Sequence, residues 1–281
     1  MEVVDERPYL LHSTTGSEAY VYDFGLRGAG ADSGVPGLDH PDTVHRLFSE
    51  AFEAAWWGDA ESDGFDRLVL GAGLDWRQVS VLRGYARYLR QAGSTFGQDY
   101  LENCLVTYAE IAALLVELFE TRFDPDRFSG PSTGLGAGEP TAVAPTAEGR
   151  TESRPDGRAE AADSLVAKIR SALDGVVSLD HDRILRAFLG LIMATMRTNF
   201  YVQDRPVDSS GRQDRVALAL KLDPHALPDL PAPRPAHEIF VYSPSMEGVH
   251  LRFGAVAGAA CAGATAGRTS VPRCSVWSRP R

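Results

Sequence analysis

The chain has 281 residues, 44% of them hydrophobic and 23% charged, so it can bury a sizeable core in one or two domains. Its net charge of −10 and isoelectric point near 5.2 argue against a nucleic-acid or anionic-membrane surface, which needs clustered cations. Three cysteines without a C-x-x-C spacing predict neither a disulfide framework nor a zinc site. The acidic N-terminus does not resemble a signal peptide, and no apolar run approaches the ~20 residues that span a bilayer. We therefore expect a cytoplasmic protein.

Two short β-like runs open the chain. Val3 and Val4 begin the first, residues 19–24 form the second, and the polar residues 13–17 between them predict a turn. Because two strands alone are marginally stable in water, this hairpin needs a sheet that the chain does not supply. Residues 28–39, rich in glycine, then predict a flexible linker.

The next stretch of the chain has the period of amphipathic helices. The first is expected over residues 41–57, with Gly58 suited to its C-cap. A second opens at Asp75, where Gln78 can complete a capping box. A third is expected over residues 98–123, and the three should pack against one another.

Residues 128–157 differ in composition from the helices around them. Gly, Pro, Ser, Thr and Ala dominate this stretch, which cannot bury enough apolar surface to offset the entropy of folding, so we predict a disordered insertion or linker. Two helices follow over residues 161–177 and 180–200, and the second is apolar enough to be buried. Three strands are expected at 216–222, 238–242 and 249–253. The predicted fold class is α+β, mainly helical, with an incomplete sheet.

Candidate binding motifs are few. Gly71 and Gly73 resemble the start of a dinucleotide-binding turn, whose glycines let the backbone approach a pyrophosphate. The third glycine is absent and no βαβ unit follows, so a loop and helix cap is the favoured interpretation and a small NAD-binding protein the weakest. A similar run at residues 134–138 lies in the predicted insertion and is weaker still.

The acidic residues Asp124, Asp126, Asp180 and Asp182 stand at helix boundaries, where aspartate more often caps a helix than binds a metal. Cys104 is expected to be a small buried side chain. The histidines include no pair at the i, i+4 spacing of metal ligands and are expected to be ordinary surface or core residues: His12, His40, His45, His181, His225, His237 and His250.

The second helix carries Arg83, Arg87 and Arg90 on one face. We interpret this face as solvated, with binding of an acidic ligand or of another domain as the alternative. No nucleophile, base and orienting residue can be combined from these candidates, so no catalytic, cofactor-binding or metal-binding residue is assigned.

Five segments together carry a resemblance: LVLGAGLDWRQVSVLRGYARYLRQAGSTFGQDYLENCLV, ELFETRFDP, LDHDRILRAFLGLIMATMRTNF, LKLDP and PRPAHEIFVYSPSMEGVHLRFG. In this order they resemble the large NAD-specific glutamate dehydrogenases. These are very long bacterial enzymes with N-terminal ACT-like regulatory domains, helical segments and a C-terminal catalytic region. The resemblance runs from about Val3 to Ala257, and the predicted insertion departs from the family.

The resemblance implies a division of the chain into six parts. These are a remnant of the last ACT-like domain (1–27), a helical region (28–127), the disordered insertion (128–157), a helical hairpin (158–202), the first strands of a truncated catalytic domain (203–257) and an out-of-frame disordered tail (258–281).

The tail is unusual in composition: its 24 residues contain no Asp or Glu, four Arg and two of the three Cys. After EGVHLRFG the family is expected to continue with a GGLRW-type substrate-binding segment. Codons for that continuation, read one base later, spell residues 262–279 of this chain. We therefore predict a frameshift within residues 257–260 and give Cys261, Cys274 and Trp277 no functional role.

The activity that the resemblance implies is the oxidative deamination of glutamate with NAD and water, which yields 2-oxoglutarate, ammonia and NADH in glutamate catabolism. NAD is the cofactor of the full-length family, whose members are expected to be homo-oligomers. Because the substrate-binding and Rossmann parts are expected to be missing, we expect this chain to bind no NAD, to be inactive alone and to need the rest of the dehydrogenase as its partner. The alternative is a stand-alone helical interaction or regulatory module that pairs with a separately encoded catalytic subunit.

Overall fold

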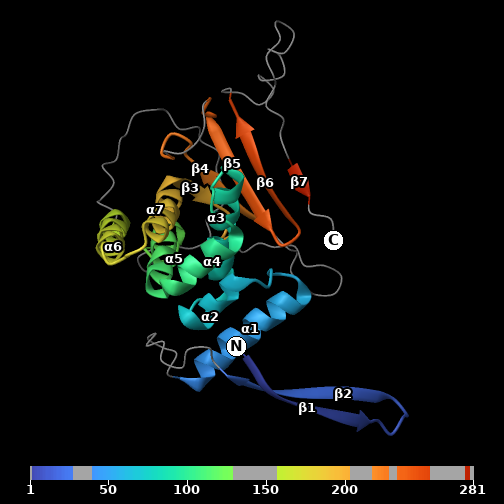
Figure 1. The fold of residues 1–281 in the computed structure, drawn as a ribbon. Coiled ribbons are helices and arrows are strands. Elements are labelled where there is room, and N and C mark those ends of the chain that lie inside the picture. The colour runs from blue at the N-terminus through green and yellow to red at the C-terminus, as the bar shows by residue number, and fades with distance from the viewer. Residues whose placement is uncertain are drawn as a thin grey trace, which may run out of the picture.

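The computed structural model describes residues 2–27, 40–128, 157–202, 217–227, 233–253 and 276–278. In these ranges helices α1 to α7 accompany two antiparallel sheets, so the predicted α+β, mainly helical class is confirmed (Figure 1). The linker predicted at 28–39 lies outside the described residues. The insertion predicted at 128–157 also lies outside them, except for its two end residues.

The N-terminal hairpin extends away from the helices (Figure 1). Its strands, β1 (Glu2–His12) and β2 (Glu18–Arg27), are longer than predicted and pair only with each other, with Pro8 opposite Tyr22. Gly16 in the connecting turn has a φ of 86°, a value that glycine adopts without steric cost. Large apolar side chains of both strands are exposed, and in the described part of the chain the hairpin pairs with no other strand. Its origin in an ACT-like domain stays a prediction.

Helix α1 (Pro41–Trp57) begins and ends where the sequence predicts. Its proline occupies the first turn, where a missing N–H costs nothing. Gly58 follows with a φ of 72°, the left-handed conformation of a C-cap glycine. Leu47 and Ala54 face inward and are buried, and α1 contacts α2 and α3.

The glycine motif lies between helices. The turn η1 (Gly64–Asp66) leads into the short α2 (Arg67–Gly71), and Gly73, with a φ of 68°, reverses the chain before α3 (Trp76–Gln91). All described strand pairs are antiparallel, so no βαβ unit surrounds these glycines. The interpretation as a loop that leads to a helix cap is confirmed.

The single helix predicted at 98–123 is two helices, α4 (Gln98–Thr107) and α5 (Ala109–Phe123). Tyr108 separates them with a φ of −112° and a ψ of 54°. The Thr107 hydroxyl donates to the Asn103 carbonyl at 2.7 Å, a back-bond that bends helices. The prediction was wrong at this point because apolar periodicity does not report a local break.

The helix predicted at 180–200 is shorter than expected. Helix α6 (Gly157–Leu173) is followed by α7 (Leu179–Ala194), and the chain then becomes strand β3 (Thr195–Thr198). Thr195 pairs with Leu222 of a neighbouring strand, and this long-range pairing overrides the helical pattern. The predicted burial of α7 is confirmed for one side of the helix, between Ile184 and Ala194, whereas residues on its other side such as Arg186 and Met193 are exposed.

The larger sheet has the order β3-β4-β5-β6-β7. The predicted strands are β4 (Leu218–Leu222), β5 (His237–Ser243) and β6 (Met246–Arg252). Strand β7 (Val276–Ser278) lies in the tail that was expected to be disordered, and its main chain pairs with the outer edge of β6, so that expectation does not hold for these three residues. The rest of residues 258–281 lies outside the described residues.

The core lies between the helices and one face of the sheet. Helix α3 contacts α5, α7 and strand β5, and Figure 1 shows it crossing in front of the strands. Phe119, Phe188 and Phe240 are among the largest fully buried side chains and come from α5, α7 and β5. Helix α3 is therefore the element that joins the helices to the sheet.

Candidate functional site: the polar junction around helix α3

Helix α3 starts at a reciprocal cap. The Asp75 carboxylate accepts from the Gln78 backbone N–H at 2.8 Å, and the Gln78 side chain accepts from the Asp75 backbone N–H at 2.8 Å. The predicted capping box is thus confirmed. The Gln78 side-chain amide also donates to Glu120 of α5 at 2.6 Å, and this bond holds the start of α3 against α5.

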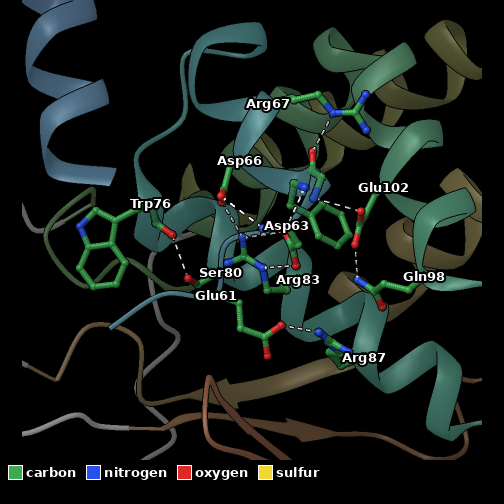
Figure 2. A network of polar contacts seen from close by, with 12 residues as sticks. Glu61, Asp63, Asp66, Arg67, Trp76, Ser80, Arg83, Arg87, Gln98 and Glu102 are labelled. Atoms are coloured by element: carbon green, nitrogen blue, oxygen red, sulfur yellow. Dashed lines mark hydrogen bonds and ion pairs between the residues drawn. The ribbon is translucent and has the colours of Figure 1, made fainter. Parts of the chain in front are cut away.

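The position of Arg83 contradicts the interpretation of the arginine face of this helix as solvated. Its side chain is 1% exposed, and its guanidinium donates twice to Asp63, at 2.8 and 2.9 Å, and once to Asp66 at 2.9 Å (Figure 2). Burial is the largest single influence and lowers the pKa of the Arg83 guanidinium, but the hydrogen bond with Asp63 and the charges of its neighbours together outweigh burial, so the net shift of this pKa is upward. The face was expected to be solvated, yet only Arg90 of the three arginines is exposed.

The acidic partners of Arg83 stand on the turn that precedes α2. Asp63 caps that turn by accepting from the Phe65 backbone N–H at 3.0 Å while it holds Arg83. Burial raises the pKa of Asp66, and its attraction to Arg83 opposes the rise. Glu102 of α4 accepts from the Gly64 backbone N–H at 3.0 Å, and burial raises its pKa as well.

Gly64 lies close to the Glu102 carboxylate. A Cβ on Gly64 would lie 2.3 Å from Oε2 of Glu102, so a larger residue would force this carboxylate to move. That movement would disturb the hydrogen bond from the Gly64 backbone N–H to Glu102, which connects the acidic turn to α4 (Figure 2).

Arg87, one helical turn after Arg83, reaches the sheet. It forms an ion pair with Glu61 of the loop before η1, and its Nε lies 3.7 Å from a carboxylate oxygen of Glu247 on β6. The Arg87 side chain is 5% exposed, so this charge is buried between the loop, α3 and the sheet. One arginine thus bridges a helical segment and a strand.

Strand β5 presents its buried face to α3. Glu238, Phe240 and Tyr242 alternate along this face. The Tyr88 hydroxyl donates to Glu238 at 2.9 Å, and the Tyr88 ring packs edge-on against Phe240 with centroids 5.5 Å apart. Gly84, one turn earlier, allows the close approach, because a Cβ there would lie 3.2 Å from a methyl group of Leu218.

A second set of contacts joins the helices to β3. The Tyr85 hydroxyl and the Thr195 hydroxyl lie 2.7 Å apart, and Arg122 of α5 donates to the Thr195 carbonyl at 3.2 Å. Arg77 donates to the Phe200 carbonyl at 2.7 Å and lies over that residue's ring. The start and the middle of α3 therefore both hold the segment around β3.

We call one set of these residues the α3 junction. Its members are Glu61, Asp63, Asp66, Arg83, Arg87, Tyr88, Glu102, Glu238, Tyr242 and Glu247. Within the described part of the chain, four of its buried atoms have no hydrogen-bond partner: Arg83 Nη1, Arg87 Nε, the Tyr242 hydroxyl and Glu238 Oε2.

The side chains of the α3 junction are better suited to holding α3 against the sheet than to catalysis. Burial raises the pKa of both Tyr88 and Glu238, so the tyrosine keeps its proton and the pair acts as a hydrogen bond. The two arginines are committed to carboxylates. Among the described residues no group of three or more His, Cys, Asp or Glu side chains could hold a metal ion.

The other candidates stay apart from the junction. Asp124 ends α5 and accepts from the Asp126 backbone N–H at 2.9 Å, a local turn contact. Asp180 lies in the first turn of α7, where Ser178 rather than an aspartate provides the side-chain cap. Cys104 is buried, as predicted, and burial raises its thiol pKa to about 12, which makes it a poor nucleophile.

The sequence contained one signal for the junction that periodicity ignores. An acidic loop with Glu61, Asp63 and Asp66 precedes a helix whose arginines Arg83 and Arg87 are spaced i, i+4. Side chains at this spacing lie on one face of a helix, so both arginines can meet the same loop. Opposite charges predict ion pairs only if the two segments that carry them pack against each other. The connection between this acidic loop and the helix is short, which favours such packing.

Comparison with known families divides the chain at this junction. Residues 60–125 match the family "Glutamate dehydrogenase, helical motif 3", and residues 168–262 match "Bacterial NAD-glutamate dehydrogenase, catalytic domain". Asp63, Arg83 and Arg87 lie in the first match, and Glu238 and Glu247 in the second. The α3 junction therefore connects the helical-motif match to the catalytic-domain match.

Similar proteins agree with these matches. The chain is 40% identical over 256 residues to an NAD-specific glutamate dehydrogenase of Mycobacterium tuberculosis, 91% of this chain and 14% of that protein. It is 38% and 40% identical over 258 residues to the proteins of the same name from Halomonas elongata and Pseudomonas aeruginosa, each time over 92% of this chain and 14% of the relative.

The fold and the junction define the class of the chain: a helical motif attached to a segment of a dehydrogenase catalytic domain. With nine-tenths of its length matched at about 40% identity, the chain belongs to the family of bacterial NAD-specific glutamate dehydrogenases. It spans 14% of the length of the relatives it matches. In the part of the chain that the structure describes, no helix is long and apolar enough to cross a membrane.

Proposed function

We propose that this chain is a piece of an NAD-dependent glutamate dehydrogenase that positions the catalytic domain and does not catalyse the reaction by itself. The observation that carries the proposal is the α3 junction, where Arg87 and Tyr88 hold the strands of the catalytic-domain match through Glu247 and Glu238. These contacts are buried and polar, and polar contacts of this kind fix one arrangement of two packed parts.

The reaction of the whole enzyme sets requirements that the junction does not meet. Removal of the α-hydride of glutamate needs cations for the substrate carboxylates, a group that accepts a proton and a domain that presents the nicotinamide. In the described residues the buried arginines are paired with the protein's own carboxylates, so they have no place for a substrate carboxylate. The role that suits them is support of the strands.

The tail supports the second half of the proposal. Residues 258–281 contain no acidic residue, and codons for the family's expected continuation would spell residues 262–279 if read one base later, so we propose that the substrate-binding segment of the family is overwritten in this chain. NAD would be the cofactor of the complete enzyme, in which other segments of the family's polypeptide would supply the site.

The proposal is tested by an activity assay of the purified chain. The purified chain is incubated with glutamate and NAD, and NADH is followed at its absorbance maximum, beside a complete relative as the positive control. We expect no glutamate-dependent NADH from this chain. Turnover by the chain that survives further purification would overturn the proposal, and resequencing the codons for residues 257–260 tests the frameshift separately.

A second function, a helical module that pairs with a separately encoded catalytic subunit, is favoured by one observation. Large apolar side chains stay exposed on the hairpin and on α1, among them Tyr20 and Trp56. A start codon and promoter directly downstream, followed by a Rossmann domain, would favour this module. If the downstream DNA instead encodes the Rossmann domain in the other reading frame, without a start codon and promoter of its own, the proposal of a dehydrogenase gene interrupted by a frameshift would be favoured.

A further inference from the structure

The strands near the two edges of the larger sheet are built differently. At one edge, β3 has only four residues, and its pairing with β4 is irregular between Thr195 and Arg197. Near the other edge, β6 has seven residues, contains no proline and pairs with β5 without a register shift. Short or irregular strands are typical of a natural sheet edge, whereas a long and regular strand is a template for a further strand. Strand β6 therefore has the features of an internal strand.

The main chain of β6 offers hydrogen bonds on the side away from β5. The Ala236 N–H donates to the Arg252 carbonyl at 2.8 Å, so Arg252 directs its main-chain groups toward the side of β5. Main-chain groups of successive residues in an antiparallel strand alternate between its two neighbours. Glu247, Val249 and Leu251 therefore direct their N–H and carbonyl groups to the outer edge of the sheet.

The face of β6 that is shared with the helices is only partly covered. Val249 pairs with Phe240, whose side chain is buried against α3, and cross-strand partners lie on the same face of a sheet. Leu251, two residues further, lies on that face as well and is 42% exposed. A strand added outside β6, with apolar residues at every second position, would cover Leu251 and extend the core.

Strand β7 shows how this edge is filled. It pairs antiparallel with the first three residues of β6, so within the described part of the chain no strand pairs with the outward groups of Val249 and Leu251 (Figure 1). The pairing of Trp277 with Glu247 is a contact between main chains. The edge of β6 thus accepts an extended segment through its main chain.

We propose that the outer edge of β6 is a strand-addition site for another segment of the dehydrogenase polypeptide, and that β7 is a displaceable strand that partly blocks this site. The identity of the occupant rests on the proposed function, because the chain spans 14% of its relatives and most of the family's polypeptide lies outside it. The occupant is an extended segment with alternating apolar residues, long enough to reach Val249 and Leu251. Its main chain supplies the affinity, and its apolar side chains, packed against Leu251, select the face.

The first measurement is amide hydrogen exchange of the full chain, resolved by residue. The Glu247 N–H faces β7 and should be protected, whereas the Val249 N–H lies beyond β7 and should exchange faster. Trp277→Pro removes the N–H that faces β6 and should lower the protection of Glu247 about fivefold or more. Ser278→Pro is the matched control: by the same alternation its N–H points away from β6, where proline is tolerated, so the protection of Glu247 should stay unchanged.

The second measurement adds a strand from outside. The probe is a heptapeptide with blocked ends, Lys-Val-Thr-Val-Thr-Val-Lys, and it should protect the N–H groups of Val249 and Leu251 in the Trp277→Pro variant. In the wild type the peptide has to displace β7, and pairing of β7 in about nine of ten molecules would lower the apparent affinity about tenfold. The same peptide N-methylated at every residue between the lysines donates no main-chain hydrogen bond there and should not bind.

A third measurement identifies the face on which the peptide is held. Leu251→Ser should weaken peptide binding about fivefold, because it removes apolar surface that the added strand would cover. Met246→Ser is the matched control: Met246 is 44% exposed but lies on the opposite face of β6, so the peptide should bind this variant as before. Circular dichroism of each variant verifies that the fold is retained.

Three results would overturn the strand-addition site: no protection of Val249 and Leu251 by the peptide, equal protection by the N-methylated peptide, or protection without peptide that rises with protein concentration. The last result would mean that a second copy occupies the edge. Unchanged protection of Glu247 in Trp277→Pro would overturn the blocking role of β7. Dehydrogenase activity of the chain would refute the proposed function and change none of these readouts, so the two proposals fail separately.

Discussion

The buried carboxyl of Glu238 makes the α3 junction sensitive to pH. Glu238 is 2% exposed and accepts one hydrogen bond, from Tyr88 at 2.9 Å, while its other oxygen has no partner among the described residues. Burial raises the pKa of this carboxyl, and the bond from Tyr88 only partly opposes the rise. The perturbation that tests this is Glu238→Gln, because glutamine has nearly the same shape, is neutral at every pH and can still accept from Tyr88.

The magnitude follows from proton linkage. A carboxyl with a raised pKa binds its proton more tightly in the folded state, so its contribution to stability is fully present below the unfolded pKa and is lost as the pH rises through the folded pKa. The wild type should therefore lose free energy of unfolding as the pH rises from mildly acidic toward neutral. The loss is about 1.4 kcal/mol for each pH unit that separates the folded pKa from the unfolded pKa. In Glu238→Gln this part of the pH dependence disappears.

The assay is urea unfolding followed by far-ultraviolet circular dichroism at half-unit steps from about pH 4.5 to pH 8, a range that covers a raised carboxyl pKa. Glu238→Gln should resemble the wild type at the acidic end and exceed it in stability at the alkaline end. Glu50→Gln, on the exposed face of α1, is the matched control and should follow the wild-type profile. Two identical profiles for the wild type and Glu238→Gln would refute the reasoning, because the buried carboxyl would then carry no penalty.

Three further predictions concern stability and use the same unfolding assay. Arg83→Met should lower the free energy of unfolding by about 3–5 kcal/mol, because it leaves two partly buried aspartates without their cation. Arg186→Met, which breaks an exposed i, i+4 pair, should lower it by less than about 1 kcal/mol. Equal losses would show that burial of the ion pair does not matter. Gly84→Ala should destabilise the fold, because the new Cβ would lie 3.2 Å from a leucine methyl group of β4. At Gly190 a new Cβ would have no neighbour within 4 Å, so Gly190→Ala should stabilise the fold by about 0.5–1 kcal/mol. Stabilisation by both substitutions would contradict the close packing of α3. Ser178→Ala should cost about 0.5–2 kcal/mol through loss of the α7 cap, and an unchanged midpoint would argue that the cap is not formed in solution.

Elements whose ends depend on nearby residues could be predicted from the sequence. Gly58 ends α1 and Asp75 with Gln78 starts α3, and in each case the chemistry lies within a few residues of the boundary. The positive φ of glycine and the oxygen of a capping side chain act locally. The strands of the β5–β6 hairpin were also predicted, but the second was expected to begin at residue 249, so its tight turn and its register were not.

Elements whose form depends on distant partners could not be predicted in this way. Thr195 ends α7 because its main chain pairs with Leu222, which lies beyond a long connection. Hydrophobic period alone continued the helix through Phe200. The break at Tyr108 was missed for a related reason, since the side-chain bond of Thr107 to a backbone carbonyl changes no apolar position.

The arginines of α3 were predicted wrongly because exposure was inferred from charge alone. A charged stripe on a helix is solvated unless opposite charges are brought to it, and here the loop before η1 brings Asp63 and Glu61. Removing these charges from water is costly, and pairing offsets that cost only when the geometry is close, as the bidentate contact of Arg83 is. The contacts therefore add less to net stability than an apolar core of the same size would.

What buried ion pairs of this kind contribute instead is one defined arrangement of the parts they join. Displacement of Arg87 from Glu61 and Glu247 would leave charges buried without partners, so these pairs, together with the packed aromatic contacts, favour one register of the strands against α3. The position of the α3 junction at the border between the helical motif and the catalytic domain is consistent with this role.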